Sequence, residues 1–207
     1  MSNINVTQAF LPPKEDYEYY ISKIWETSHL TNNGPLLKEF ELSIKKYLEI
    51  DNFQFVANGT IALQLAIRAF DFDDGEIITT PFSYVATTSA IMWEGFKPIY
   101  ADIDSDTLCM DPNNIETLIT DKTRAIIPVH VFGNTCEIEK IEAIAKKHNL
   151  KVIYDAAHSF GVTHNGKSVF EYGDISITSF HATKLFHTIE GGGIFTKSSN
   201  DAWQGYN

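Results

Sequence analysis

Cysteine and proline are scarce in this sequence of 207 residues, which contains two cysteines and seven prolines. Cys109 and Cys136 stand far apart in the chain, and neither belongs to a CxxC pair. A disulfide framework or a structural zinc site needs more cysteines at closer spacing. We therefore expect two reduced thiols, as in a cytoplasmic protein, and no metal site built on cysteine.

Long apolar runs and clusters of positive charge are also missing. No stretch approaches the roughly 20 apolar residues that span a bilayer, and the opening MSNINVTQAF has neither the basic start nor the apolar core of a signal peptide. The net charge is -11, whereas a nucleic-acid backbone attracts clustered basic residues. We therefore predict a cytoplasmic protein without a membrane or nucleic-acid partner.

The sequence has enough apolar material for a folded protein. Hydrophobic residues make up 43% and aromatic residues 13% of the chain, which is long enough for one substantial core or two small ones. Apolar residues at helical spacing predict helices at residues 17–28 and 35–50, on either side of the polar loop HLTNNGP, and Pro35 suits a first helical turn.

Beyond residue 50 the pattern becomes one of strands followed by helices. The strands are predicted within NFQFVANGT, GEIITTP, KPIYADID, TRAIIPVHVFG, KVIYDAAHSFG and GIFTKS. Buried strands without polar alternation, separated by helices, predict an α/β fold in which a mainly parallel sheet lies between two layers of helices. Ligands of such three-layer α/β/α folds bind at the carboxyl ends of the strands.

Lys184 stands close to such a strand end, in the stretch SFHATKLFHTIEGGG. A lysine in a partly desolvated cleft loses its proton more easily and forms a Schiff base with a carbonyl compound. Pyridoxal phosphate is a carbonyl cofactor whose other groups also need partners. Asp155, at the end of KVIYDAAH, suits its pyridinium nitrogen, and His158, three residues later, suits its phenolic oxygen.

The phosphate and the ring of this cofactor have candidate partners too. Gly59 and Thr60 at a predicted helix start, together with the hydroxyl of Ser179, suit the phosphate, and Phe82 suits the ring face. Each candidate also has a structural alternative: a solvated helix lysine for Lys184, a helix cap for Asp155, Thr60 or Ser179, a core position for Phe82, and a hydrogen-bonded buried imidazole for His158.

Other polar features predict no further site. Five histidines lack cysteine or acidic partners at metal-ligand spacing: His130, His148, His164, His181 and His187. The run from Gly191 to Gly193 matches neither the P-loop nor the dinucleotide pattern. We expect no metal, and we expect these glycines to serve a close approach of backbone.

The order NGT, TPFSYVAT, YDAAHSFG and SFHATK resembles the sugar aminotransferases of the DegT/StrS family, which have the aspartate aminotransferase fold of fold type I. The resemblance runs from LTNNGPLLKEFE to the glycines after Lys184. It implies that Lys184 holds pyridoxal phosphate covalently, that Asp155 binds the ring nitrogen and that His158 neighbours the ring hydroxyl. It also implies phosphate contacts from Gly59, Thr60 and Ser179, and a ring cover from Phe82.

The resemblance implies an aminotransferase that moves an amino group, usually from glutamate, to a keto carbon of a nucleotide-linked deoxysugar. The stretch around Lys184 looks most like the branch that acts at C4 of dTDP-4-keto-6-deoxyglucose. Three alternatives stay open: a C3-acting relative, another fold type I enzyme such as a lyase or desulfurase, and a fragment that binds the cofactor without turnover.

The family resemblance also predicts the domain organisation. Residues 1–34 are expected to form a helical segment and a substrate-side loop, and residues 35–207 the cofactor-binding large domain. Family members continue into a smaller domain, whereas this sequence stops at DAWQGYN, so that domain is expected to be absent. A homodimer is expected because relatives build each site from two chains. The ending GYN resembles a family motif that binds the partner's cofactor phosphate, which makes Asn207 a candidate ligand.

Overall fold

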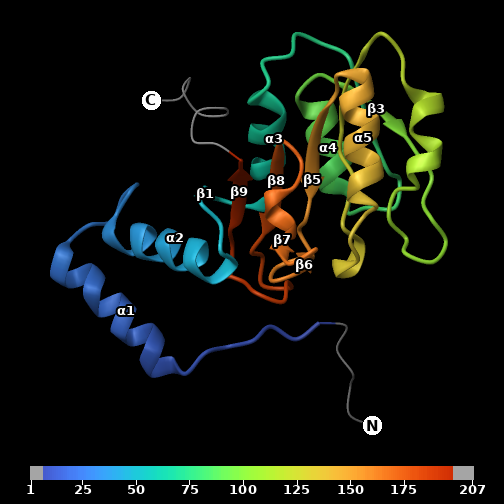
Figure 1. Cartoon of the computed structure of the whole chain (residues 1–207). Helices are drawn as coiled ribbons and strands as arrows, with labels where there is room; N and C mark the ends of the chain where they lie inside the picture. Colours follow the sequence, from blue (N-terminus) through green and yellow to red (C-terminus); the bar gives the residue numbers. More distant parts are fainter. Residues whose placement is uncertain (1–6, 198–207) are drawn as a thin grey trace.

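A computed structural model describes residues 7–197 and places a seven-stranded sheet among helices (Figure 1). The spatial order of the strands is β1, β9, β8, β5, β4, β2, β3. The strands are β1 (Phe53–Val56), β2 (Glu76–Thr79), β3 (Lys97–Tyr100), β4 (Thr123–Ile126), β5 (Lys151–Asp155), β8 (Ile175–Ser179) and β9 (Gly192–Thr196). The helices are α1 (Lys14–Thr27), α2 (Pro35–Leu48), α3 (Gly59–Arg68), α4 (Val85–Trp93) and α5 (Ile138–His148).

Smaller elements occupy the connections of the sheet. A separate two-stranded sheet pairs β6 (Thr163–His164) with β7 (Lys167–Ser168). Four short 3-10 helices are described: η1 (Pro112–Asn114), η2 (Glu116–Leu118), η3 (Val131–Gly133) and η4 (Val169–Glu171). Among residues 7–197, no helix combines the length and the apolar character that crossing a membrane requires.

The prediction of a mainly parallel sheet is confirmed. β3, β2, β4, β5 and β8 pair with one another in parallel, because helices or long connections carry the chain back between them. β9 is antiparallel to both of its neighbours, β8 and β1. The reason is local: a loop without a helix, residues 180–191, joins β8 to β9 and returns the chain in the opposite direction.

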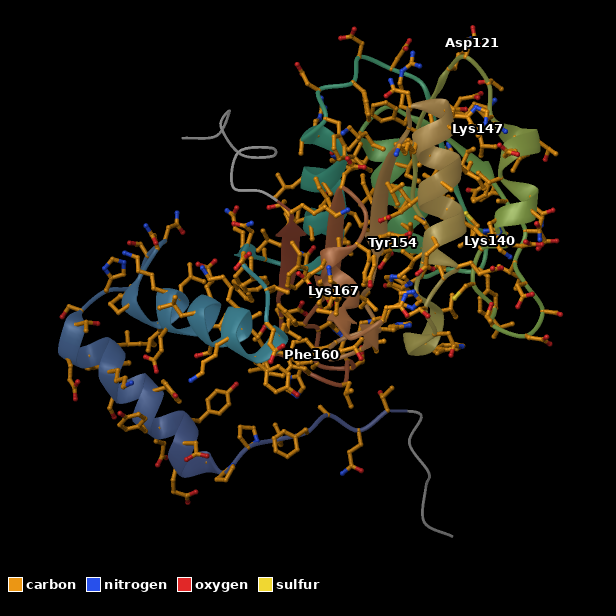
Figure 2. All side chains as sticks on the ribbon, in the orientation of Figure 1. Asp121, Lys140, Lys147, Tyr154, Phe160 and Lys167 are labelled. Carbon is orange, nitrogen blue, oxygen red and sulfur yellow. The ribbon has the colours of Figure 1, made fainter. Side chains whose placement is uncertain are left out.

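The helices form two layers, one on each face of the sheet, as predicted. Successive strand residues face opposite layers: Ile77 packs in the cluster with α3 and α4, whereas Ile78 packs in the cluster with α5. Figure 1 shows α5 in front of the sheet, with α3 and α4 behind it. Tyr154 of β5, labelled in Figure 2, belongs to the layer of α5. Burial on both faces explains why the strand sequences show no polar alternation.

A third cluster, rich in aromatic rings, attaches α2 to the sheet edge. Phe40 of α2 meets Phe53 and Phe180 edge-to-face, at 6.1 Å in each case. Tyr47, also on α2, stacks at 5.7 Å on Phe160, which is labelled in Figure 2. By contrast, none of the residues of α1 is buried, and this helix lies apart from the sheet. The predicted division of the chain at residue 34 stays a prediction.

Gly192 lies where β9 passes beneath the turn between β1 and α3. A Cβ atom at this position would lie 2.5 Å from the carbonyl oxygen of Asn58 and 2.7 Å from the backbone nitrogen of Gly59. Both distances are below the van der Waals limit, and both partners are backbone atoms that cannot rotate away. The expectation that the glycine run serves a close backbone approach is confirmed for Gly192.

Gly192→Ala is therefore expected to destabilise the protein by about 3 kcal/mol, because β9 or the turn must shift to admit the methyl group. Gly161→Ala is the matched control: its φ is +78°, but its Cβ would meet nothing within 4 Å, so a cost of about 1 kcal/mol is expected. Urea unfolding measures both free energies. A cost for Gly192→Ala no greater than that of the control would contradict the close contact.

Candidate active site

A cavity of about 510 Å³ opens at the carboxyl ends of β5 and β8, beside the first turn of α3. This volume lies within the range of about 300–1,000 Å³ that is usual for ligand sites. The predicted site residues that line it are Gly59, Thr60, Asp155, His158, Ser179 and Lys184. Residues that are far apart in the sequence meet here because parallel strands end at the same edge of the sheet.

Asp155 is the last residue of β5, and its position is fixed by the backbone on both sides. Its N–H donates to the carbonyl of Pro128 at 2.9 Å, and its own carbonyl accepts the N–H of His130 at 3.0 Å. The carboxylate is almost fully buried, at 5% exposure. It accepts the hydroxyl of Thr87 at 2.7 Å and the N–H of Ala157 at 3.2 Å.

The charge of Asp155 depends on opposing influences. Burial raises the pKa of this carboxyl, while the bonds from Thr87 and Ala157 and the nearby His158 and Lys184 lower the pKa. The pKa is raised overall, and the ionised form that these donors favour can accept a hydrogen bond from a protonated ring nitrogen. Asp155 also caps no helix among the described residues, since none begins directly after it.

Lys184 lies in the loop of residues 180–191 and outside any helix. Backbone bonds close this loop: Phe180 N–H donates to Gly191 at 2.8 Å, Ala182 N–H donates to Ile189 at 2.8 Å, and Lys184 N–H donates to His181 at 2.9 Å. Burial lowers the pKa of the Lys184 ammonium, and the charge of Asp155 partly restores it. The amine is therefore easier to deprotonate than that of an exposed lysine, which a nucleophile requires.

The pKa of His158 depends on both of these charged groups. Burial lowers its pKa, Lys184 lowers it further, and Asp155 raises it. His158 is an exposed residue on the cavity wall, and its imidazole is suited to donating or accepting a hydrogen bond there.

The first turn of α3 and the end of β8 form a cradle suited to an anion. The side chain of Asn58 caps α3 by accepting the N–H of Ile61 at 2.9 Å. A Cβ on Gly59 would lie 2.9 Å from Cβ and 3.4 Å from Oγ of Ser179, so a larger residue would displace the serine hydroxyl. Free N–H groups at a helix N-terminus and a hydroxyl beside them are the donors that phosphate prefers.

Phe82 does not line the cavity. The ring of Phe82 is 41% exposed and meets Phe132 edge-to-face at 6.4 Å, and Phe132 in turn stacks on His158 at 5.8 Å. Phe82 thus lies next to the cavity wall, and its role as a ring cover stays a prediction. Asn207 lies outside the described residues.

Several further residues of the cavity wall received no role from the sequence, and of these only Tyr84 and Glu190 lie outside the strand-end positions to which the predicted fold directs attention. The further residues are Asn58, Ser83, Tyr84, Thr183 and Glu190, together with His181, which had been set aside as a metal ligand. The imidazole of His181 contacts the hydroxyl of Thr183 at 2.9 Å and a carboxylate oxygen of Glu190 at 3.7 Å. The available signal was position, since His181 and Glu190 flank Lys184 within one short loop.

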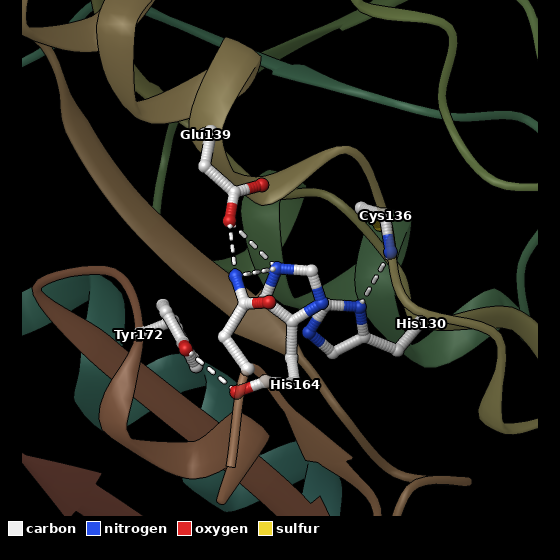
Figure 3. Close-up of polar contacts among 6 residues, drawn as sticks. His130, Cys136, Glu139, His164 and Tyr172 are labelled. Carbon is white, nitrogen blue, oxygen red and sulfur yellow. Dashed lines mark hydrogen bonds and ion pairs between the residues drawn. The ribbon is translucent and has the colours of Figure 1, made fainter. Parts of the chain in front are cut away.

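His130 follows β4 but belongs to the core. Its fully buried ring stacks on Tyr154 at 4.8 Å, and its Nδ1 accepts the N–H of Cys136 at 3.1 Å (Figure 3). Burial lowers the pKa of His130 to about 3, so the ring is neutral. Figure 3 also shows His164 bound to Glu139. Within residues 7–197, no group of three or more His, Cys, Asp or Glu side chains is arranged to hold a metal ion.

The donor set of the cavity fits pyridoxal phosphate. A buried carboxylate for the ring nitrogen, a lysine with a lowered pKa for the aldehyde, and a cradle of helix N–H groups and a hydroxyl for the phosphate all face one cavity. The described residues thus offer a partner for each charged or reactive group of that cofactor.

The electrostatic coupling of Lys184 to Asp155 gives a test that needs no cofactor. Competitive acetylation across a pH series, with exposed Lys167 as the reference for reagent reactivity, is expected to give Lys184 a midpoint below 10.5. Asp155→Asn should lower the midpoint further, because it removes the negative charge that favours the ammonium. A midpoint that rises or stays unchanged in Asp155→Asn would contradict the coupling.

Comparison with known proteins adds independent support. The family model described as the DegT/DnrJ/EryC1/StrS aminotransferase family matches residues 13–204. The dTDP-4-amino-4,6-dideoxy-D-glucose transaminase of Shigella dysenteriae is 48% identical over 195 residues, which are 94% of this chain and 53% of the relative. The chain thus spans about half the length of the curated relatives it matches.

Solved structures agree with the sequence comparison. The structure of DesI in the presence of its TDP-sugar product superimposes with a TM-score of 0.88 and 30% identity, over 95% of this chain and 49% of that one. The structure of NtdA from Bacillus subtilis with bound cofactor PMP gives a TM-score of 0.83 and 34% identity, over 89% of this chain and 42% of that one. Pyridoxal phosphate, of which PMP is the amine form, is the cofactor of this fold and family. The chain belongs to the DegT/DnrJ/EryC1/StrS aminotransferase family.

Proposed function

We propose that this protein is a pyridoxal-phosphate-dependent aminotransferase that moves an amino group from an amino acid to a nucleotide-linked keto-deoxysugar. The observation that carries the proposal is one cavity lined by Asp155, Lys184 and the anion cradle of α3 and Ser179. Family membership supports the class of reaction.

Lys184 has two tasks in this proposal. Its amine, whose pKa is lowered by burial, would hold the cofactor through the cofactor's aldehyde group. When free, Nζ would act as the base that takes the proton from the α-carbon of the amino donor. When bound, pyridoxal phosphate supplies an electron-accepting ring and carries the nitrogen between the two substrates.

The remaining residues bind and orient. Asp155 would bind the ring nitrogen and hold a proton on it. Gly59, Thr60 and Ser179 bind the phosphate, His158 bonds to the ring hydroxyl, and Phe82 covers the ring. Asn207 is proposed as a ligand of the partner subunit's cofactor phosphate.

Glutamate is the proposed amino donor, and dTDP-4-keto-6-deoxyglucose is the proposed acceptor. The name of the relative from Shigella dysenteriae supports both the nucleotide and the C4 position. We place the protein in the cytoplasm, where nucleotide sugars are made. The organisation proposed for the chain is a substrate-side segment, residues 1–34, and a cofactor-binding large domain, residues 35–207.

The first half of the reaction tests the proposal most simply. Purified protein loaded with pyridoxal phosphate and mixed with glutamate is expected to form one 2-oxoglutarate per site, without any sugar. Lys184→Ala should abolish this reaction, because Lys184 is the one lysine among the described residues that lines the cavity. Lys167→Ala, an exposed lysine of the β7 strand, should leave the reaction unchanged.

Addition of the 4-ketosugar should then regenerate the aldehyde form and yield an amino sugar, detected by mass spectrometry. Formation of 2-oxoglutarate in Lys184→Ala at the wild-type rate would refute the role of Lys184. Tight cofactor binding without transfer to any amino acid or ketosugar would favour the alternative of a non-catalytic cofactor-binding chain.

A homodimer is part of the proposal. Tyr84, on the cavity wall, and Phe132, which stacks on His158, are 75% and 70% exposed, and a second copy of the chain would cover them. Sedimentation equilibrium should give a species of twice the 23.3 kDa chain mass. A single 23.3 kDa species at all protein concentrations would contradict the dimer.

A further inference from the structure

A short chain of hydroxyl groups leads from the cavity wall to the carboxylate of Asp155. Thr87, on α4, is fully buried, and its Oγ1 donates to Oδ2 of Asp155 at 2.7 Å. Oγ of Ser83 lies 2.6 Å from Oγ1 of Thr87. Ser83 lines the cavity, so this series of hydrogen bonds connects the cavity wall, through Thr87 of α4, to the Asp155 carboxylate.

The charge of Asp155 sets the direction of these bonds. An ionised carboxylate only accepts hydrogen bonds, so the single hydrogen of Thr87 must point toward it. The lone pairs of Thr87 Oγ1 are then free to accept the hydrogen of Ser83. Ser83 has one alternative acceptor, the carbonyl of Tyr84 at 3.0 Å, while the N–H of Thr87 donates to that same carbonyl at 3.2 Å.

Burial raises the pKa of Asp155 and so disfavours its ionised form, and only a few groups lower that pKa. The groups that face the carboxylate are the N–H of Ala157, His158 in the segment after β5, Lys184 in the loop of residues 180–191, and the Cys136 thiol before α5. His158 and Lys184 lie in the cavity, where a ligand changes their charge. Thr87 has no charge that a ligand could change, and its burial in α4 keeps water from replacing Asp155 as the acceptor of its hydroxyl hydrogen.

The geometry points to Thr87 as a positioning residue that holds the carboxylate of Asp155 ionised and fixed in orientation, with Ser83 aligning the Thr87 hydroxyl. This inference rests on the proposed function, in which Asp155 must be ionised to keep the ring nitrogen protonated. If the role of Thr87 were merely structural, its hydrogen bond to Asp155 would stabilise the fold without changing the pKa of that carboxyl.

The test measures the protonation of Asp155 directly, in protein without cofactor. Asp is labelled with ¹³C at the side-chain carboxyl, and the Asp155 resonance is assigned by its loss in Asp155→Asn. Thr87→Val removes the hydroxyl and keeps the β-branched shape. Its titration midpoint for Asp155 is expected to rise by about one pH unit or more, the usual worth of a hydrogen bond to a charged group.

Matched variants separate the hydroxyl from the packing. Thr88→Val is the control, because Thr88 is the next residue of α4 and its hydroxyl contacts Tyr100 at 3.4 Å, not Asp155. It should leave the midpoint at the wild-type value, and Thr87→Ser should restore most of the shift. Ser83→Ala should raise the midpoint by less than Thr87→Val, and this half-buried position provides the test if Thr87→Val fails to fold.

A second readout is the dissociation constant of pyridoxal phosphate. Binding that needs ionised Asp155 weakens as the pH falls through its pKa, so Thr87→Val is expected to move the pH at which binding weakens upward by the same unit or more. An Asp155 midpoint that is equal in wild type, Thr87→Val and Ser83→Ala would overturn the inference.

The outcomes distinguish this inference from the proposed function. A raised midpoint in a protein that binds no pyridoxal phosphate would support the role of Thr87 toward Asp155 and refute the cofactor proposal. An unmoved midpoint in a protein that binds cofactor and reacts with glutamate would refute the role of Thr87 alone.

Discussion

The buried carboxylate of Asp155, fixed at the end of β5, is the constraint around which the site is arranged. Its backbone is bonded to the segment that follows β4, so its place is as rigid as the sheet. Burial raises the pKa of this carboxyl, and the donors around it lower that pKa. Burial also lowers the pKa of the Lys184 ammonium, so its proton is easier to remove than that of an exposed lysine. A carboxylate acceptor and a readily deprotonated amine in one cavity suit the transfer of an amino group.

The cavity depends on a close approach of backbone as much as on charge. Gly192 at the start of β9 lies against Asn58 and Gly59, and Gly59 lies against Ser179 at the end of β8. Because of these contacts, the first turn of α3 packs against the start of β9 and the end of β8, and its N–H groups lie beside the hydroxyl of Ser179. The loop that carries Lys184 begins directly after Ser179 and ends just before Gly192. One tight packing point therefore positions both the anion cradle and the lysine.

Much of this was predictable because it depends on local signals. Short strands without polar alternation, separated by helices, predicted the parallel sheet, and residues at strand ends, such as Asp155 and Ser179, share an edge in any such sheet. The other site residues could not be predicted, because their contacts depend on tertiary packing. Thr87 resembles any threonine of a helix until α4 is packed against β5. Glu190 lines the cavity only because of how its loop folds. Phe82 contacts Phe132, which no pattern singled out and which in turn stacks on His158.

The claim that Lys184 is the reactive amine of this cavity has one most direct test. Purified protein is incubated with pyridoxal phosphate and reduced with borohydride, and the modified peptide is identified by mass spectrometry. The account predicts a single modified residue, Lys184, and an absorbance band that Lys184→Ala lacks. Modification of surface lysines in proportion to their exposure, with none on Lys184, would contradict the account.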